Sequence, residues 1–315
     1  MTLKLIVKDK GDRIDLWLSN HILNISRARI QKLIKTGNVI VNNEICKTKK
    51  EQVFLGDCLQ IYLPSPKKLE LMPEAIPLDI LYEDEYLIVI NKVAGMVVHP
   101  SPGHTEGTLV HALLHHCSYL SDVGEFHRPG IVHRLDKDTT GTIVVAKTAF
   151  VHQHLQKQIR DRTIKRQYIA VVHGVLKNKE NNSYKIDKGV INLPIGRHPV
   201  DRKKMAIIPI DKNGRKAVTY WKILERLGNY SLVKFNLETG RTHQIRVHSS
   251  FLGCPVLGDP LYSSNRSFNI NLSGQVLHAH KLSLVHPINL NRFEVTASLP
   301  LEFTKLLKSL RQKNN

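Results

Sequence analysis

The sequence predicts an α+β protein built from two bodies. Its 315 residues correspond to about two domains of roughly 150 residues each. Short apolar runs alternate with a few helical segments between residues 78 and 300, which is compatible with a mixed, largely antiparallel central sheet flanked by helices. The stretch Pro64-Ser65-Pro66-Lys67-Lys68 has the composition of a linker that extends towards Pro77. We therefore expect a small domain over residues 1–63, a linker over 64–77 and a larger domain over 78–315.

The composition points to a polyanionic partner. The chain has 46 Lys and Arg against 27 Asp and Glu, a net charge of +19, which favours nucleic acid or an anionic membrane. No apolar run approaches the roughly 20 residues of a membrane span. The N-terminal stretch has neither the apolar segment nor the small-residue cleavage site of a signal peptide. We expect a monomer that meets nucleic acid in the cytoplasm and has no membrane partner.

The sequence contains no recognisable motif for binding a metal or a cofactor. His111 and His115 are four residues apart on an expected helix and could share one face, but no HExxH glutamate and no third ligand accompany them. A P-loop and a dinucleotide-binding GxGxxG are also missing from the sequence. The cysteines form no CxxC pair, and a long chain without a secretion signal favours free thiols. They are Cys46, Cys58, Cys117 and Cys254. We expect no metal and no cofactor.

The small domain is predicted to contain a basic helix. Ser26 is a good N-cap and Gly37 a good C-terminal stop, with Ile30, Leu33 and Ile34 between them at helical spacing on one face. Basic residues occupy the rest of its surface: Arg27, Arg29, Lys32 and Lys35. By itself this pattern fits an ordinary solvated helix. A short helix over residues 13–18 precedes it, and strands are expected over 39–41 and 57–61.

The larger domain begins with a predicted hairpin over residues 78–82 and 87–91 and a helix over 108–116. Thr148 can cap a helix that runs to about Arg162, because apolar residues recur every four positions along it. Residues 165–172 read as a strand, as do residues 232–237. Thr242 is a plausible N-cap for a helix that ends at Gly253, and residues 301–310 have the spacing of an amphipathic helix.

The chain is organised around residues 128–147. Two apolar runs, residues 131–132 and 143–146, flank a polar stretch that is rich in turn-forming residues and contains Gly141. The pattern predicts a strand, a tight loop and a second strand, with Asp136 presented at a strand end beside Arg134. If the strand persists, Arg134 and Asp136 share one of its sides. Taken alone, a loop aspartate more often caps a turn than performs chemistry.

Residues 133–141, HRLDKDTTG, resemble the signature of the RluA/RluD family of RNA pseudouridine synthases. Further matches follow in the family's order: the strand over residues 165–174, the segment GRTHQ over 240–244, and residues 258–260 and 277–280. The resemblance covers roughly residues 78–300. It implies the pseudouridine synthase fold, isomerisation of uridine to pseudouridine in RNA, and no cofactor.

The resemblance also implies roles for single residues. Asp136 corresponds to the family's nucleophile, Tyr168 to the tyrosine that lies over the target base, and Arg241 to the arginine that pairs with the catalytic carboxylate. Arg134 corresponds to the arginine that enters the RNA where the flipped base has left. The basic segment over residues 196–205 resembles a family segment expected to meet phosphate through Arg197, Arg202, Lys203 and Lys204.

Residues 12–62 resemble a small RNA-binding module first seen in a ribosomal protein, the S4-like domain. This resemblance makes Arg27, Arg29 and Lys32 an expected phosphate-contacting surface. The implied partner is large-subunit (23S) ribosomal RNA or a pre-ribosomal particle, with uridines in the stem-loop called helix 69 as the target. The alternative is a sister synthase that acts on other uridines of 23S ribosomal RNA or on tRNA.

Two functions from other classes compete with this interpretation. One is metal-dependent cleavage of phosphodiesters with Asp136 and Asp138 as paired ligands, but two-metal sites need further carboxylates, which do not gather here. The other is a ribosome assembly factor without turnover. The intact set of Asp136, Tyr168 and Arg241 argues against it.

Overall fold

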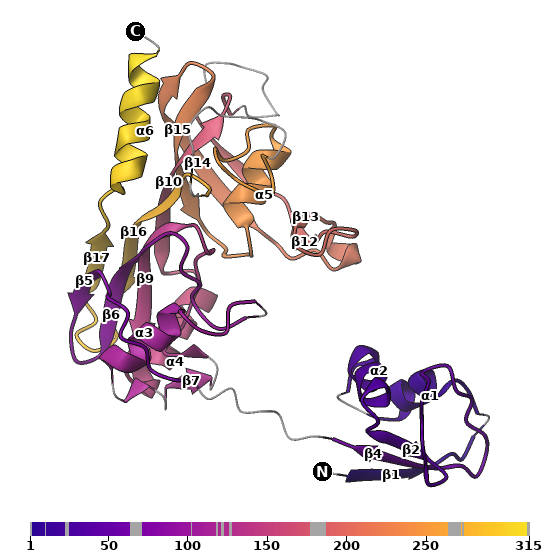
Figure 1. The fold of residues 1–315 in the computed structure, drawn as a ribbon. Helices are drawn as coiled ribbons and strands as arrows, with labels where there is room; N and C mark the ends of the chain where they lie inside the picture. Colours follow the sequence, from indigo (N-terminus) through magenta and orange to yellow (C-terminus); the bar gives the residue numbers. More distant parts are fainter. Residues whose placement is uncertain are drawn as a thin grey trace. The chain divides into compact units, whose positions relative to one another are not determined.

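The computed structural model describes residues 2–9, 11–22, 25–63, 71–101, 103–117, 119–120, 123–125, 128–176, 187–263, 272 and 274–313. The chain divides into two compact units, Met1–Glu70 and Leu71–Asn315 (Figure 1). Residues 64–70 of the expected linker lie outside the described part of the chain. Among the described residues, no helix has both the length and the apolar character needed to cross a membrane.

The first unit is a four-stranded antiparallel sheet with two helices. The strands pair in the order β1-β4-β2-β3. The elements are β1 (Thr2–Ile6), α1 (Ile14–His21), α2 (Arg27–Lys35), β2 (Val39–Val41), β3 (Glu44–Ile45) and β4 (Cys58–Tyr62). Ser26 caps α2 by accepting a hydrogen bond from the Arg29 amide, as predicted. The expected apolar face of α2 is buried, and Gly37 follows the helix with a φ of 71°.

A buried carboxylate ties α1 to α2. Asp15 has no exposed side-chain surface and accepts hydrogen bonds from Arg13, Arg27 and Gln31, at 2.9 Å from Arg27 and 2.6 Å from Gln31. Burial acts to raise the pKa of Asp15, but the hydrogen bonds from Gln31 and Arg27 outweigh it and hold the pKa below its ordinary value. Arg27 is therefore engaged within the unit, whereas Arg29 and Lys32 are exposed on α2.

The second unit is built on a nine-stranded sheet. Its main path runs β11-β14-β15-β10-β16-β9-β6-β5, and β17 pairs with β16. The neighbours are antiparallel except for β9 and β16, which are parallel. The strands are β5 (Ile80–Glu83), β6 (Leu87–Lys92), β9 (Thr140–Ala146), β10 (Lys165–His173), β11 (Lys188–Asn192), β14 (Val218–Leu227), β15 (Tyr230–Leu237), β16 (Leu277–Val285) and β17 (Arg292–Thr296). The predicted mixed, largely antiparallel sheet is confirmed.

Helices and two small ribbons complete the second unit. They are α3 (Leu109–His116), α4 (Ala149–Arg160), α5 (Gln244–Phe251), α6 (Leu301–Gln312), a 3-10 turn (Ile210–Lys212), and the pairs β7 (Gly124–Glu125) with β8 (Arg128–Pro129) and β12 (Ile195–Arg197) with β13 (Met205–Ile207). Thr148 caps α4 as predicted, because its hydroxyl accepts a hydrogen bond from the Val151 amide. The prediction of Thr242 as the cap of α5 is wrong, since α5 begins at Gln244 and His243 occupies the cap position.

The central segment departs from its prediction in one respect. The expected second strand is β9, but residues 132–139 form loop and turn, and Ile131 makes only an isolated bridge to Val145. The strand therefore does not persist through Arg134 and Asp136, and the condition for their sharing one of its sides is not met. Gly141 lies opposite Ala279 in the parallel pair, with a φ of 107°, and an added Cβ would come within 2.3 Å of the Ala279 carbonyl oxygen. Glycine at this position lets β9 and β16 approach at the centre of the sheet.

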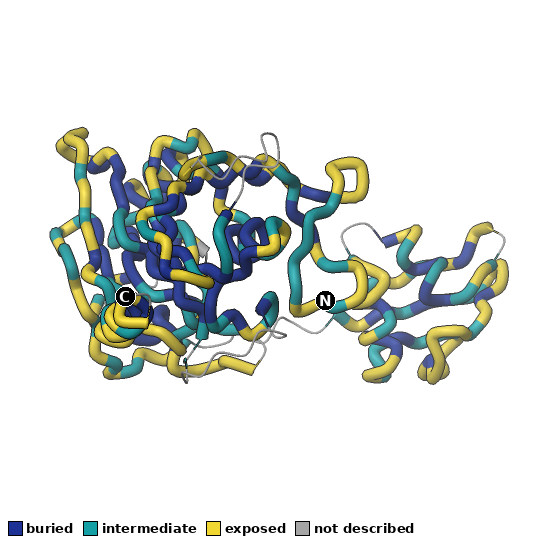
Figure 2. Tube along the Cα trace, turned by 90° about the horizontal axis from the view of Figure 1, so that it is seen from above, coloured by how far each residue is buried: buried dark blue, intermediate teal, exposed yellow. Residues whose placement is uncertain are grey.

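The interior of each unit follows its sheet. Figure 2 shows the buried segments running through the middle of each unit, with exposed residues along the outer turns. In the second unit, β9 is buried along nearly its whole length, as expected for a strand covered on both faces. Its apolar core continues into β6 and β10 and includes Tyr168. This core gives the loop before β9 a rigid base.

The first prediction concerns Asp15. We expect Asp15→Asn to lower the free energy of unfolding of the first unit by about 1.5–3 kcal/mol, because it removes the charge that accepts the hydrogen bonds of Arg27 and Gln31. Hydrogen exchange of α1 and α2 amides in the full chain measures this loss. Glu44→Gln, on the exposed strand β3, is the control. Equal exchange rates in the two variants would contradict a stabilising role for this carboxylate.

Candidate active site

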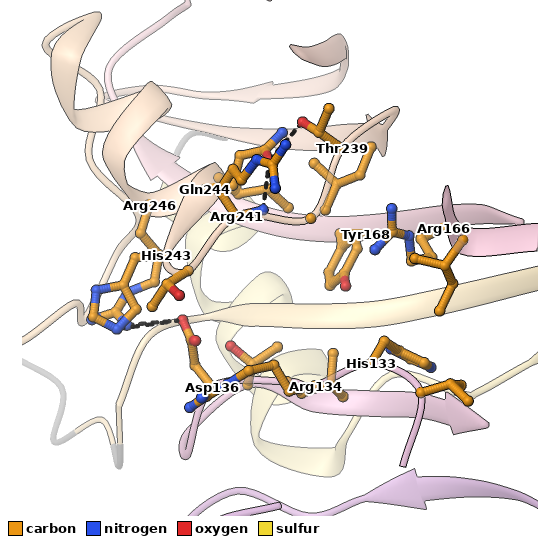
Figure 3. Close-up of a pocket in the computed structure, with 18 of the residues that line it drawn as sticks. His133, Arg134, Asp136, Arg166, Tyr168, Thr239, Arg241, His243, Gln244 and Arg246 are labelled. Atoms are coloured by element: carbon orange, nitrogen blue, oxygen red, sulfur yellow. Dashed lines mark hydrogen bonds and ion pairs between the residues drawn. The ribbon is translucent and has the colours of Figure 1, made fainter. Parts of the chain in front are cut away.

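Several segments meet around a cavity of about 550 Å³ in the second unit. The loop before β9 contributes His133, Arg134 and Asp136, and β10 contributes Tyr168. The segment between β15 and α5 contributes Thr239, Arg241 and His243, and the first turn of α5 contributes Gln244 and Arg246. The other labelled residue of Figure 3 is Arg166 of β10. Asp136, Tyr168 and Arg241, which are distant in the sequence, thus line one cavity.

Arg246 holds the carboxylate of Asp136. Its Nη1 donates a hydrogen bond to Oδ2 of Asp136 at 2.9 Å. Asp259 binds the other two nitrogens of this guanidinium. Its Oδ2 accepts a hydrogen bond from Nε at 2.7 Å, and its Oδ1 accepts one from Nη2 at 2.9 Å. The Arg246 side chain is 4% exposed and that of Asp136 16% exposed, so the open side of the Asp136 carboxylate faces the cavity. A fixed guanidinium therefore orients the Asp136 carboxylate towards the cavity.

Asp259 is the buried end of this arrangement. Its Oδ1 also accepts hydrogen bonds from the Leu261 amide at 2.9 Å and the Tyr262 amide at 3.1 Å. Burial acts to lower the pKa of Arg246, but the hydrogen bonds and charges of Asp259 and Asp136 raise it above its ordinary value. Arg246 therefore stays charged, and its two carboxylate partners balance it in a buried position.

The predicted pairing of Arg241 with Asp136 is wrong. Arg241 lies in the turn before α5, where its Nε donates to the Lys216 carbonyl at 3.0 Å and its amide donates to Oε1 of Gln244 at 2.9 Å. Arg246 lies in the first turn of α5 and reaches the carboxylate instead. Both arginines belong to the same short segment, and the pattern of residues does not say which one faces Asp136. A signal was available in Asp259, an aspartate that needs a cationic partner if it is buried.

His243 is a cavity residue that the sequence did not single out. Its Nε2 lies 4.0 Å from Oδ2 of Asp136, and its Nδ1 shares a hydrogen bond of 3.0 Å with the Tyr262 hydroxyl. The backbone of His243 is left-handed, with a φ of 56°, a conformation that costs energy for a residue with a side chain. Burial lowers the pKa of His243 below its ordinary value, so the ring is neutral at neutral pH. A neutral ring facing the carboxylate favours the tautomer with its proton on Nε2.

Tyr168 forms one wall of the cavity. Its ring enters from β10, where Tyr168 pairs with Phe235 of β15, and Figure 3 shows the hydroxyl directed towards the loop with Arg134 and Asp136. Burial raises the pKa of Tyr168, and the charge of Asp136 adds to this effect. The phenol therefore remains neutral, which suits a surface for packing against a flat ring.

A buried lysine anchors the loop that carries Asp136. The ammonium of Lys92, at the end of β6, donates to the carbonyls of Val93, Met96 and Lys137 at 2.7, 2.9 and 2.8 Å. Lys137 follows Asp136 directly, so this contact fixes the backbone beside the carboxylate. Burial lowers the pKa of Lys92 to about 8, with the charges of Asp138 and Asp136 acting in the opposite direction. Lys92 therefore remains mostly protonated at neutral pH.

His133 supports the same loop from its other end. Its Nε2 accepts a hydrogen bond from the Val144 amide of β9 at 3.1 Å. Burial lowers the pKa of His133 to about 3, and the charge of Arg166 contributes to this shift. The ring therefore stays neutral and keeps its acceptor nitrogen throughout the physiological pH range.

The residues predicted to bind RNA lie in three places. Arg134 is exposed and lines the cavity. Arg197, Arg202, Lys203 and Lys204 belong to the β12–β13 hairpin, where Arg197 donates to the Arg202 carbonyl at 2.9 Å and Lys204 lies 4.0 Å from Asp201. Arg27, Arg29 and Lys32 are on α2 of the first unit. Their contacts with RNA stay a prediction.

The described residues contain one group with the geometry to hold a metal ion, Glu83, His116 and Cys117. The Glu83 carboxylate already accepts hydrogen bonds from Lys147 at 2.9 Å and from His116 at 2.8 Å. An ammonium in contact with the carboxylate competes with a cation. His111 and His115 do not belong to this group, because His111 is buried against Thr108 at 2.8 Å and His115 is exposed.

Comparison with known proteins identifies the family. The family model described as RNA pseudouridylate synthase matches residues 86–251, and the S4 domain model matches residues 12–57. An uncharacterised RNA pseudouridine synthase of Synechocystis sp. is 52% identical over 96% of this chain and 90% of the relative. The chain belongs to the RNA pseudouridine synthase family. It is therefore an RNA-modifying isomerase with an N-terminal S4 domain, which confirms the resemblance drawn from residues 133–141 and 12–62.

Two further relatives place this synthase more closely. Ribosomal large subunit pseudouridine synthase D of Zymomonas mobilis is 40% identical over 96% of this chain and 95% of the relative. The solved structure of human RNA Pseudouridylate Synthase Domain Containing 4 is 28% identical, with a TM-score of 0.57, and the match covers 74% of this chain and 92% of the human chain. The expected pseudouridine synthase fold is thus confirmed.

The second prediction separates the two arginines of the segment 241–246. Arg246→Met leaves Asp259 buried without its partner, so we expect it to lower the free energy of unfolding of the second unit by about 3–5 kcal/mol. Arg241→Met removes one bond to a backbone carbonyl, and we expect a loss of about 1 kcal/mol.

Urea unfolding monitored by the fluorescence of Trp221, in a Trp17→Phe background, measures both losses in the second unit. The chain has two tryptophans, and each unit holds one of them. Losses of equal size in the two variants would contradict the assignment of Arg246 as the buried partner.

Proposed function

We propose that this synthase converts specific uridines of 23S ribosomal RNA to pseudouridine with Asp136 as its nucleophile. The observation that carries the proposal is the carboxylate of Asp136, held by Arg246 at 2.9 Å and open to a cavity walled by Tyr168. The relative from Zymomonas mobilis, named for the large ribosomal subunit, supports the choice of RNA. The substrate is ribosomal RNA, so we place the reaction in the cytoplasm, on free RNA or on a pre-ribosomal particle, and expect a monomer.

The reaction needs a nucleophile and an enclosed space. Uracil is detached from its ribose, turned within the site and rejoined through its C5 carbon, and the proton of C5 then leaves. A carboxylate forms a covalent intermediate when it is directed at an electrophilic carbon. Asp136 is the carboxylate that Arg246 directs into the cavity. The cavity of about 550 Å³ retains the detached base while it turns.

Tyr168 and Arg134 have separate tasks in this scheme. The neutral phenol of Tyr168 packs against the uracil face and limits its motion to rotation in the ring plane. A paired uridine must leave its stack to reach Asp136, which costs a few kcal/mol. Arg134 is exposed at the cavity, and its planar guanidinium can stack where the base has left. It thereby offsets part of the cost of flipping.

The target uridines we propose are those of helix 69. The alternative is a sister enzyme for other uridines of 23S ribosomal RNA or of tRNA. One observation favours keeping this alternative: the Synechocystis relative, at 52% identity, has a name that specifies no target, whereas the synthase D of Zymomonas mobilis is 40% identical. Mapping pseudouridines in ribosomal RNA and tRNA from cells with and without the gene decides between the two. Loss confined to helix 69 supports our choice, and loss elsewhere overturns it.

The third prediction tests the nucleophile. We expect Asp136→Asn to abolish pseudouridine formation because a neutral amide cannot attack, while binding of the substrate RNA changes less than about 3-fold. Pseudouridine content after a single turnover and a binding titration measure the two effects. Asp138→Asn, two residues further along the loop, is the matched control and should retain turnover. Substantial pseudouridine formation by Asp136→Asn would remove Asp136 from this role.

The fourth prediction tests the basic helix of the S4 domain. Arg29 and Lys32 are exposed on α2, so we expect Arg29→Gln with Lys32→Gln to weaken RNA binding at every salt concentration. Each lost phosphate contact should make the slope of log K against log salt shallower by about 0.7–0.9. The control is Lys305→Gln with Lys308→Gln, which removes the same charge from the exposed side of α6. An identical slope in both double variants would show that α2 does not contact phosphate.

A further inference from the structure

We propose that the cavity contains a phosphate subsite, formed by Arg166 and Arg241 beside Arg162, that binds a phosphodiester next to the target uridine. This inference deepens the proposed function and rests on RNA as the substrate. The subsite is separate from the Asp136–Arg246 pair, because Arg246 is already occupied by two carboxylates.

The sheet register brings the three arginines together. Arg166 of β10 lies opposite Leu237, the last residue of β15, so residues 238–241 continue alongside the start of β10. Arg162 lies in the turn between α4 and β10, with a left-handed φ of 60°. All three side chains line the cavity. Three positive groups from three segments therefore converge at one end of the site.

Gly240 makes room for the guanidinium of Arg166. A Cβ added to Gly240 would lie 2.5 Å from Nη1 of Arg166, which is closer than real contacts allow. The φ of Gly240 is not positive, so its backbone conformation does not demand glycine. The absence of a side chain leaves room for the Arg166 guanidinium beside Gly240, the residue that precedes Arg241.

Among the described residues, a single carboxylate, that of Glu238, pairs with this cluster of three arginines. Glu238 forms an ion pair with Arg162 and also accepts a hydrogen bond from Tyr220 at 3.1 Å. Neither Arg166 nor Arg241 has an ion pair with a described residue, and the buried Nε of Arg166 has no hydrogen-bond partner there. Burial and the nearby charges of Arg215 and Arg162 lower the pKa of Arg241, a sign of crowded like charges. Such a cluster favours a bound anion.

The position of the subsite identifies that anion as a phosphodiester. Arg166 and Tyr168 are two residues apart on β10 and share its cavity side, so they are about 6.6 Å apart along the strand. A uracil packed on Tyr168 thus leaves Arg166 and Arg241 within reach of a phosphate attached to the same nucleotide or its neighbour. Guanidinium groups match the tetrahedral oxygens of phosphate through paired hydrogen bonds. The strand would then be held at the target base, independently of α2.

A charge-swap experiment on both molecules tests this subsite. The probe is a substrate RNA in which each phosphate within three positions of the target uridine is replaced, one at a time, by a neutral methylphosphonate. Each methylphosphonate RNA carries a 2′-O-methyl group on the sugar next to the replaced phosphate to prevent cleavage. Its all-phosphate reference carries the same 2′-O-methyl group. Equilibrium binding is measured for the wild type, Arg166→Gln and the control Lys308→Gln, whose lost charge lies on α6.

We expect one methylphosphonate position to weaken binding by about 10-fold or more in the wild type and in Lys308→Gln. The same replacement should change the affinity of Arg166→Gln by less than about 2-fold, because its contact is already lost. The subsite is overturned if no position loses its effect in Arg166→Gln. This outcome is expected if the replacements weaken binding equally in all three proteins. It is also expected if the arginines bind a free anion and not a phosphate of the RNA.

A second variant covers the case in which Arg166→Gln fails to fold. Gly240→Ala keeps every charge but shifts the end of the Arg166 side chain, so it should reduce the effect of the same methylphosphonate. An unchanged effect in this variant would contradict the geometry proposed here. Because binding is measured without turnover, failure of the subsite differs from failure of the proposed function, in which the wild type forms no pseudouridine in the unmodified RNA.

Discussion

The ion pair between Arg246 and Asp136 is the constraint on which the rest of the site depends. A carboxylate facing a cavity is useful only if it is charged and oriented, and a single surface ion pair would provide neither. Here Arg246 is held at two of its nitrogens by the buried Asp259 and offers a third to Asp136. The cost of burying these charges is offset because each has a hydrogen-bonded partner of opposite sign.

The sheet brings Asp136 and Arg246 together. Asp136 precedes β9, Arg246 follows β15, and the order β15-β10-β16-β9 places β10 with Tyr168 between them. Two contacts hold the loop that carries Asp136. They are the parallel pairing of β9 with β16 at Gly141 and the hydrogen bond from the Lys92 ammonium to the Lys137 carbonyl. The site thus combines a loop anchored next to β9, the strand β10 and the first turn of α5, which suits chemistry that needs fixed angles.

Local signals in the sequence were sufficient for most elements and for the family. Ser26 and Thr148 cap the helices they were expected to cap, and β10 lies where its alternating residues predicted it. Arg246, His243 and Lys92 could not be found in this way, because their roles depend on contacts with residues distant in the sequence. The resemblance assigns this role to Arg241, which lies within GRTHQ over residues 240–244. Arg246 lies two residues beyond that motif, and its contact with Asp136 becomes apparent only in the folded chain.

The central claim is that Arg246, and not Arg241, orients Asp136, the nucleophile we propose. Its most direct test is the rate of the chemical step, measured as tritium release from C5 of uridine in a single turnover at saturating enzyme, in Arg246→Lys and in Arg241→Lys. Lysine keeps the charge but loses the fork that bridges Asp259 and Asp136, so we predict a loss of about 100-fold or more for Arg246→Lys. Arg241→Lys should stay within about 10-fold of the wild type. A slow Arg241→Lys beside a nearly normal Arg246→Lys would contradict the account.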